Sequence, residues 1–182
     1  PKLNNSFFKD DVRVTAYGEV DELNVTIGLL LFHLKKYPKI ENSEYLFTRL
    51  SSIQNELFNL GTVLAAIGSN LPSNSPKIND KDILILENDI DNMNSILKPL
   101  KSFILPGGDE LTLHIHYSRV VCRRAERSLI TVIKKYSDVD INVLKYLNRL
   151  SDYLFVLGRW VSKYMNIEEK LWSPNNISSN KK

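Results

Sequence analysis

The sequence predicts an all-α protein, an up-and-down bundle of five helices. Apolar residues recur three or four positions apart in five separate stretches of the chain, which is the spacing of one helix face. Segments with Pro, Gly, Asn or Ser, of the kind that end helices, separate these stretches. No stretch alternates apolar and polar residues as a half-buried strand would, and 43% hydrophobic with 25% charged residues is an ordinary globular composition.

The first two helices are predicted over residues 11–36 and 43–67. Tyr37 and Pro38 end the first helix, since proline cannot continue it. One edge of that helix is polar and includes a glycine at which a ligand or another backbone could approach closely. The residues of this edge are Tyr17, Asp21, Asn24 and Gly28.

The other three helices are predicted over residues 80–97, 109–136 and 141–165. Asn79 is the expected N-cap of the third helix, and Pro99 follows its end. The fifth helix has its own polar stripe within about 40° on a helical wheel. The residues of that stripe are Asn148, Asp152 and Arg159.

Length and charge bound the domain organisation and the classes of partner. The 182 residues fit one domain over 1–166, followed by a polar tail, 167–182, of which Trp172 is expected to dock on a neighbour. The net charge of +3 is small and scattered, which gives no support to nucleic-acid or membrane binding. The sequence has no long apolar run, and Cys122 is its single cysteine, so no internal disulfide can form. We therefore expect a cytoplasmic protein. Since the chain begins at Pro1, we expect residues upstream of it.

The fourth helix carries charges on an otherwise largely apolar surface. Arg119, Arg123 and Glu126 fall on one stripe, which we call the charged stripe. Buried charges must pair with each other, with a partner chain or with an anionic ligand, because an isolated buried charge is too costly. Ion pairs that fix the register between helices would explain the charged stripe equally well, so both interpretations stay open at this point.

Two other features have ordinary explanations beside functional ones. The loop Pro106, Gly107 and Gly108 is a helix breaker by itself, although it could also let a flat ligand lie against the backbone, with Phe103 at its edge. A lone phenylalanine is more often a core residue. His114 and His116 resemble metal ligands but lack a Glu-x-x-His pair, and His33 is distant in sequence. We therefore predict no metal-ligating residues and no di-iron bundle.

Four blocks of sequence, in the right order, resemble the ATP:cob(I)alamin adenosyltransferases of the propanediol-utilisation type. The resemblance spans about residues 9–165, and its blocks are residues 10–24, 103–108, 119–127 and 146–152. It implies a five-helix bundle that forms a homotrimer with active sites between subunits. The implied reaction transfers the 5′-deoxyadenosyl group of ATP to cob(I)alamin and gives adenosylcobalamin and triphosphate. ATP, Mg²⁺ and the corrinoid are the implied ligands, and a corrinoid reductase or an adenosylcobalamin-dependent enzyme is a fitting protein partner.

The resemblance also implies two catalytic residues. Arg123 corresponds to the arginine that contacts ATP and supports departure of triphosphate, and a planar guanidinium suits that charge. Phe103 corresponds to the aromatic residue that packs at the lower face of the corrin and helps to remove the axial base.

Further binding residues follow from the same resemblance. Glu126 and Asn148 are similar to other ATP-site residues, while Arg119 looks like the partner of Asp21 across subunits. Asn24, on the same helix edge as Asp21, is counted with the cofactor-binding residues.

The sequence departs from the family at its beginning. The family opens with a stretch of the pattern Thr-Arg-Thr-Gly-Asp that wraps the phosphates, and nothing of that kind precedes Lys9. Either the stretch is missing from this sequence or the protein has lost it. A loss favours an alternative function, a non-catalytic trimeric bundle that binds or hands over adenosylcobalamin. A purely structural bundle is the third possibility.

Overall fold

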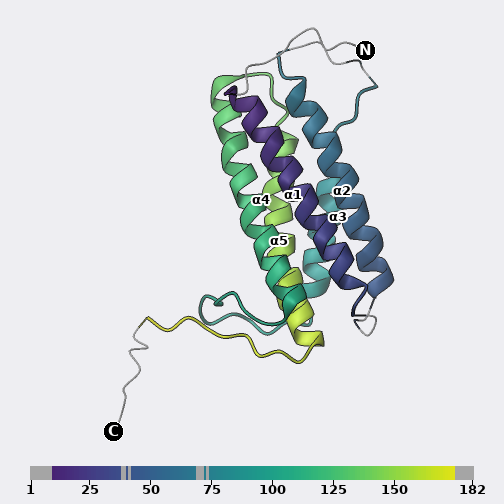
Figure 1. Cartoon of the computed structure of the whole chain (residues 1–182), viewed down its shortest axis with the longest axis vertical. Coiled ribbons are helices and arrows are strands. Elements are labelled where there is room, and N and C mark those ends of the chain that lie inside the picture. The colour runs from purple at the N-terminus through teal and green to yellow at the C-terminus, as the bar shows by residue number, and fades with distance from the viewer. Residues whose placement is uncertain (1–9, 38–39, 41, 69–71, 73, 175–182) are drawn as a thin grey trace.

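The computed structural model describes residues 10–37, 40, 42–68, 72 and 74–174. It contains five helices, each ending within three residues of its predicted bounds, so the all-α prediction is confirmed. The only extended pairing among the described residues is one isolated antiparallel bridge, between Ile104 and Leu171. The helices, labelled in Figure 1, are α1 (Val12–Leu34), α2 (Ser43–Ala65), α3 (Asp80–Asn94), α4 (Glu110–Lys135) and α5 (Ile141–Tyr164).

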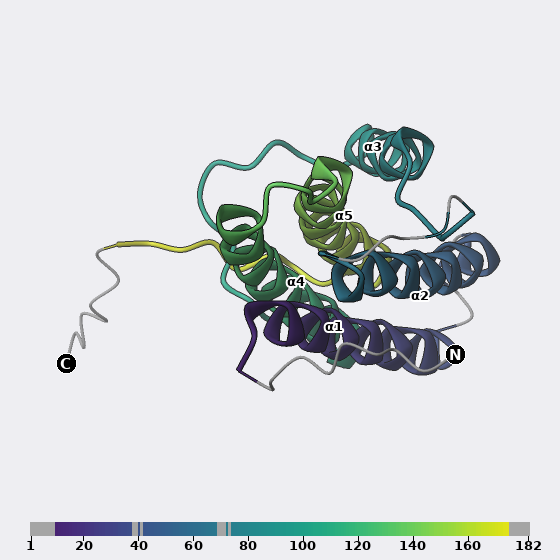
Figure 2. The ribbon, with the colours of Figure 1, turned by 90° about the horizontal axis from the view of Figure 1, so that it is seen from above.

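Helix α5 lies inside the bundle. Figure 2 shows α4 and α1 on one side of it and α2 and α3 on the other, and α5 packs mainly on α3 and α4. Apolar residues surround α5 on most sides, and such a helix is stable only when it is covered. Tyr146, Leu150 and Leu154 are each at most 1% exposed, which places the centre of the core along this helix.

Aspartate and asparagine side chains begin four of the five helices. The Asp109 carboxylate accepts a hydrogen bond from the Thr112 backbone N–H at 2.8 Å, and Asp11 and Asp140 cap α1 and α5 in the same way. Asn79 and Asp82 form a capping box at the start of α3, which confirms Asn79 as its N-cap. Because each cap satisfies backbone donors that the helix leaves unpaired, these residues determine where the helices begin.

Two loops meet at one end of the bundle, beyond the C-terminus of α5 (Figure 1). The Leu105 backbone N–H donates to the Lys170 backbone carbonyl at 2.8 Å, and the Trp172 backbone N–H donates to the Phe103 backbone carbonyl at 2.7 Å. Arg159, at the end of α5, donates to Glu169 at 2.8 Å and to the Lys98 carbonyl at 2.7 Å. The first part of the predicted tail therefore lies along the loop that carries Phe103, while residues 175–182 fall outside the described residues.

A buried ionic network joins α2, α3 and α5. The Arg49 guanidinium, 5% exposed, donates to Glu56 at 2.7 and 3.2 Å, and its Nε lies 3.4 Å from Asp89. The Tyr146 and Tyr45 hydroxyls donate to Glu56 and Asp89, each at 2.5 Å. Burial raises the pKa of Tyr45 to about 12, with the Asp89 carboxylate adding to the shift. Sequence analysis did not identify this network.

Candidate active site

The charged stripe on α4 contains two arginines that form no ion pair with any described residue. Arg119 is half-buried, and its Nε is fully covered without a hydrogen-bond partner in the described part of the chain. Its guanidinium lies 5.9 Å from the centre of the Phe155 ring. Burial, followed by the nearby charge of Arg123, lowers the pKa of Arg119. No carboxylate of the described residues therefore neutralises either of these two positive groups.

Glu126 and Asn148 are brought together across α4 and α5. The Asn148 amide nitrogen donates to the Glu126 carboxylate at 2.9 Å. The other polar residues of the α5 stripe have different partners, since Asp152 accepts from Arg149 at 2.9 Å and Arg159 is buried against Glu169. Asn148 is therefore the residue of that stripe with a hydrogen bond to the charged stripe.

A different arginine holds α1 and α4 in register. Arg124 forms an ion pair with Glu22, and Ser128 donates to Glu19 at 2.6 Å one turn further along. Interhelical ion pairing therefore explains Arg124, which belongs to the resembling block 119–127. Within one chain it does not explain Arg119 or Arg123.

The Pro-Gly-Gly loop needs a glycine at its last position. Gly108 has φ +111°, and a Cβ there would lie 3.2 Å from the Thr112 side chain. Any other residue would be strained in this conformation and would press on the first turn of α4. The loop thus turns sharply into the capping residue Asp109 at the start of α4.

Phe103 is not a core residue. Its side chain is 78% exposed, and its ring contacts the Trp172 ring edge-on, with 6.1 Å between centroids. The core interpretation of Phe103 is therefore wrong for this chain, and the ring is available to a ligand.

The polar edge of α1 faces α2 rather than the charged stripe. Asn24 is buried, and its side-chain amide donates to the Gln54 backbone carbonyl at 3.0 Å. The Gln54 side-chain amide donates in turn to the Asn24 backbone carbonyl at 3.2 Å. A Cβ at Gly28 would lie 3.3 Å from the Gln54 amide, so the glycine admits that side chain. Asp21 is exposed and borders a groove of about 350 Å³ between α1 and α2.

Asp21 and Arg119 do not meet within one chain. None of the ion pairs among the described residues joins them. Asp21 borders the α1–α2 groove, whereas Arg119 lies beside Phe155 of α5. A bridge between these two residues would require a second subunit.

Comparison with known proteins identifies the family. Residues 3–161 match the family described as Cobalamin adenosyltransferase. This chain belongs to that family. It is 40% identical over 154 residues to the corrinoid adenosyltransferase of Bacillus subtilis, a match that covers 85% of this chain and 76% of the relative. The human corrinoid adenosyltransferase MMAB is 37% identical over 174 residues, or 94% of this chain and 67% of the relative.

A solved structure of the same family has a similar fold. It is a single-residue variant of the PduO-type ATP:corrinoid adenosyltransferase from Lactobacillus reuteri, complexed with cobalamin and ATP. The two chains are 32% identical with a TM-score of 0.82, and the similarity covers 92% of this chain and 87% of the other. This cobalamin adenosyltransferase family member has no helix, among the described residues, with the length and apolarity to cross a membrane.

Sequence reasoning about this family member missed two groups of residues. Arg49 and Glu56 lie seven positions apart on α2, which places them on the same helix face two turns apart, and this spacing could have indicated a pair. Gln54 was passed over because nothing in the sequence identifies Asn24 as its partner.

Proposed function

We propose that this chain catalyses the transfer of the 5′-deoxyadenosyl group from ATP to cob(I)alamin, giving adenosylcobalamin and triphosphate. The observation that carries this proposal is the pair of α4 arginines, Arg119 and Arg123, that lack a carboxylate partner among the described residues. The Glu126–Asn148 hydrogen bond accompanies them. Membership of the cobalamin adenosyltransferase family supports it, and the Lactobacillus reuteri relative was solved with cobalamin and ATP.

In this reaction the cobalt(I) of the corrinoid substrate attacks C5′ of ATP. A cobalt–carbon bond forms while the bond from C5′ to the triphosphate oxygen breaks, and its electron pair leaves with triphosphate. Negative charge therefore grows on the leaving oxygen. A cation held in place beside this oxygen accelerates the reaction, because it stabilises the transition state more than it stabilises bound ATP. Arg123 is the group to which we assign this role, because its guanidinium can grip two phosphate oxygens at once.

The remaining residues position the nucleotide. Asn148 holds the Glu126 carboxylate, so this carboxylate is oriented before ATP binds. Mg²⁺ bound with ATP takes most of its ligands from phosphate oxygens and water, and it needs only one or two carboxylates from the protein. Glu126 can supply one such carboxylate, so the charged stripe fits ATP bound together with Mg²⁺. The Mg²⁺ ion helps to neutralise the negative charge of the triphosphate.

The activity test uses the chain together with its substrates. We expect the visible spectrum of chemically reduced cobalamin to change to that of adenosylcobalamin when ATP, Mg²⁺ and the protein are present. Omitting ATP is the control. Binding of adenosylcobalamin without turnover would instead favour the non-catalytic bundle. Loss of the phosphate-wrapping stretch would favour the non-catalytic bundle. The residues before Asp10, where this stretch would lie, are outside the described part of the chain.

A homotrimer is part of this proposal. Helices α1 and α4 pack against each other and both expose large apolar side chains, which commonly marks an interface. These residues are Val25, Leu29 and Phe32 of α1 and Leu113, Tyr117 and Val120 of α4. A stable monomer in sedimentation experiments across concentrations would contradict the trimer and the sites between subunits. The cytoplasmic location and a reductase or adenosylcobalamin-dependent partner remain predictions from the sequence.

Phe103→Ala should impair the corrinoid step and leave folding intact. An exposed ring contributes little to stability, so we expect a change below about 1 kcal/mol in the free energy of unfolding. Without the ring beneath the corrin, the axial base stays on cobalt and reduction to cobalt(I) becomes harder. Affinity for ATP should stay nearly unchanged. An equal loss of ATP affinity, measured by calorimetry, would contradict a role limited to the corrinoid.

Asp21→Asn and Arg119→Ala test the bridge between subunits. If the two side chains pair across an interface, each substitution should weaken the trimer, and the double variant should lose less than the sum. The expected coupling is roughly 0.5–3 kcal/mol. Trimer dissociation constants for the two single variants and the double variant measure it. Small and additive effects would mean that both residues are independent surface charges.

A further inference from the structure

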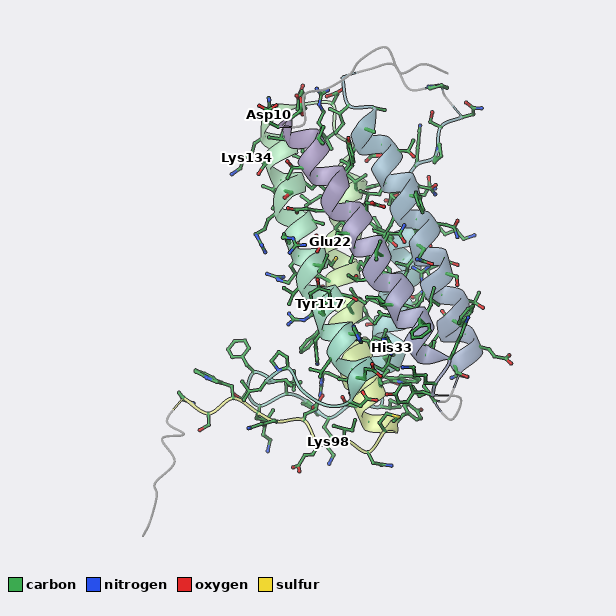
Figure 3. All side chains as sticks on the ribbon, viewed as in Figure 1. Asp10, Glu22, His33, Lys98, Tyr117 and Lys134 are labelled. Carbon is green, nitrogen blue, oxygen red and sulfur yellow. The ribbon has the colours of Figure 1, made fainter. Side chains whose placement is uncertain are left out.

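Three side chains that the proposed reaction does not use converge where α1 ends and α4 begins. His33 lies in the last turn of α1, and Glu110 and His114 lie one turn apart at the start of α4. One imidazole or carboxylate atom from each residue lies within 4.8 Å of the other two. Figure 3 labels His33 at the end of the bundle where the loops meet. We call these residues the His-Glu-His cluster.

His33 has a buried nitrogen without a hydrogen-bond partner in the part of the chain that the structure describes. The side chain is 7% exposed, and its Nδ1 faces the Glu110 carboxylate at 3.4 Å in a geometry that forms no hydrogen bond. A buried polar atom left without a partner destabilises the folded state, because it has lost its hydrogen bonds to water. A cation bound between this nitrogen and the carboxylate would satisfy both groups.

The three residues offer the ligands of a borderline metal ion. Two imidazoles and one carboxylate, with a solvent molecule in the fourth position, is a known zinc ligand set, whereas magnesium and calcium prefer oxygen ligands alone. The rings of His33 and His114 are stacked, with centroids 4.4 Å apart and 19° between planes. His114 is only partly buried, so its ring can turn toward the ion while His33 stays in place.

We propose that His33, Glu110 and His114 bind one zinc ion between the end of α1 and the start of α4. The ion would join the C-terminal end of α1 to the N-terminal end of α4. The loop that contains Phe103 and Gly108 immediately precedes α4 in the chain. Lys36 competes with it, because the ammonium lies 3.4 Å from the same Glu110 oxygen. This side chain is half exposed and can move into solvent when the ion enters.

Zinc titration of the chelator-treated full chain, without ATP or corrinoid, tests this proposal separately from adenosyl transfer. Isothermal calorimetry should show one equivalent of Zn²⁺ per chain, and Zn²⁺ should raise Tm because it binds the folded state. Glu110→Gln and His114→Gln should each weaken Zn²⁺ binding by at least about tenfold and abolish most of the Tm shift. Both positions are accessible, so these variants should fold as the unmodified chain does.

Two further variants serve as controls. Glu168→Gln changes an exposed carboxylate outside the cluster and should leave Zn²⁺ affinity unchanged. Lys36→Gln removes the competing ammonium and should bind Zn²⁺ at least as tightly as the unmodified chain. Less than one equivalent of bound Zn²⁺ would overturn the proposal, and so would equal affinity in the Glu110→Gln and Glu168→Gln variants.

Discussion

Arg123→Lys should lower kcat for adenosyl transfer by about 10²–10³-fold, the usual loss when one donor to a developing negative charge is removed. Lysine keeps the charge but lacks the planar fork that holds two phosphate oxygens together. Arg123 is exposed and forms no ion pair with a described residue, so the substitution should barely change Tm. The loss should therefore appear in kcat, measured at saturating ATP, rather than in the amount of folded protein.

Arg127→Lys is the matched control for that variant. Arg127 lies one turn further along α4, is also exposed and donates to the Arg123 carbonyl at 3.2 Å. We expect it to keep kcat within a few-fold of the natural chain, because no role in ATP binding is assigned to it. Unchanged kcat in Arg123→Lys, or an equal loss in both variants, would remove Arg123 from the proposed mechanism.

Arg49→Met should have the largest effect on stability. The substitution keeps most of the volume but leaves the buried Asp89 carboxylate and the largely covered Glu56 carboxylate without their cation. Breaking a buried ion pair from one side costs about 3–5 kcal/mol, because the remaining charge is uncompensated. Urea unfolding followed by circular dichroism should show this decrease in the free energy of unfolding.

The control for this prediction is an ion pair of the same type at the surface. Arg149→Met removes ion pairs with Glu87 at 3.3 Å and with Asp152 at 2.9 Å. The side chains of all three residues are at least 37% exposed. Solvent screens such a pair, so we expect a loss of about 0–1 kcal/mol. Similar losses in Arg49→Met and Arg149→Met would contradict a strongly coupled buried network.

The sequence alone determined the helices and the family. Periodic apolar residues and their breakers are local signals, because a helix needs its buried face every 3.6 residues and ends where proline, glycine or a capping side chain interrupts it. The five predicted helices therefore agree with the structure to within three residues. The blocks around Asp21, Phe103, Arg123 and Asn148 indicated the cobalamin adenosyltransferase family for the same reason, since each block is contiguous, and residues 3–161 match that family.

Only the tertiary structure decided which polar side chains meet. Arg119, Arg123 and Arg124 occupy neighbouring positions on one helix, yet only Arg124 forms an ion pair with another described residue, Glu22. His33 approaches Glu110 to 3.4 Å although the two residues are far apart in the chain. Such partners belong to different helices, and their contacts depend on how the helices pack and rotate against each other. A helical period determines the direction of a side chain on its own helix and does not determine what lies opposite it.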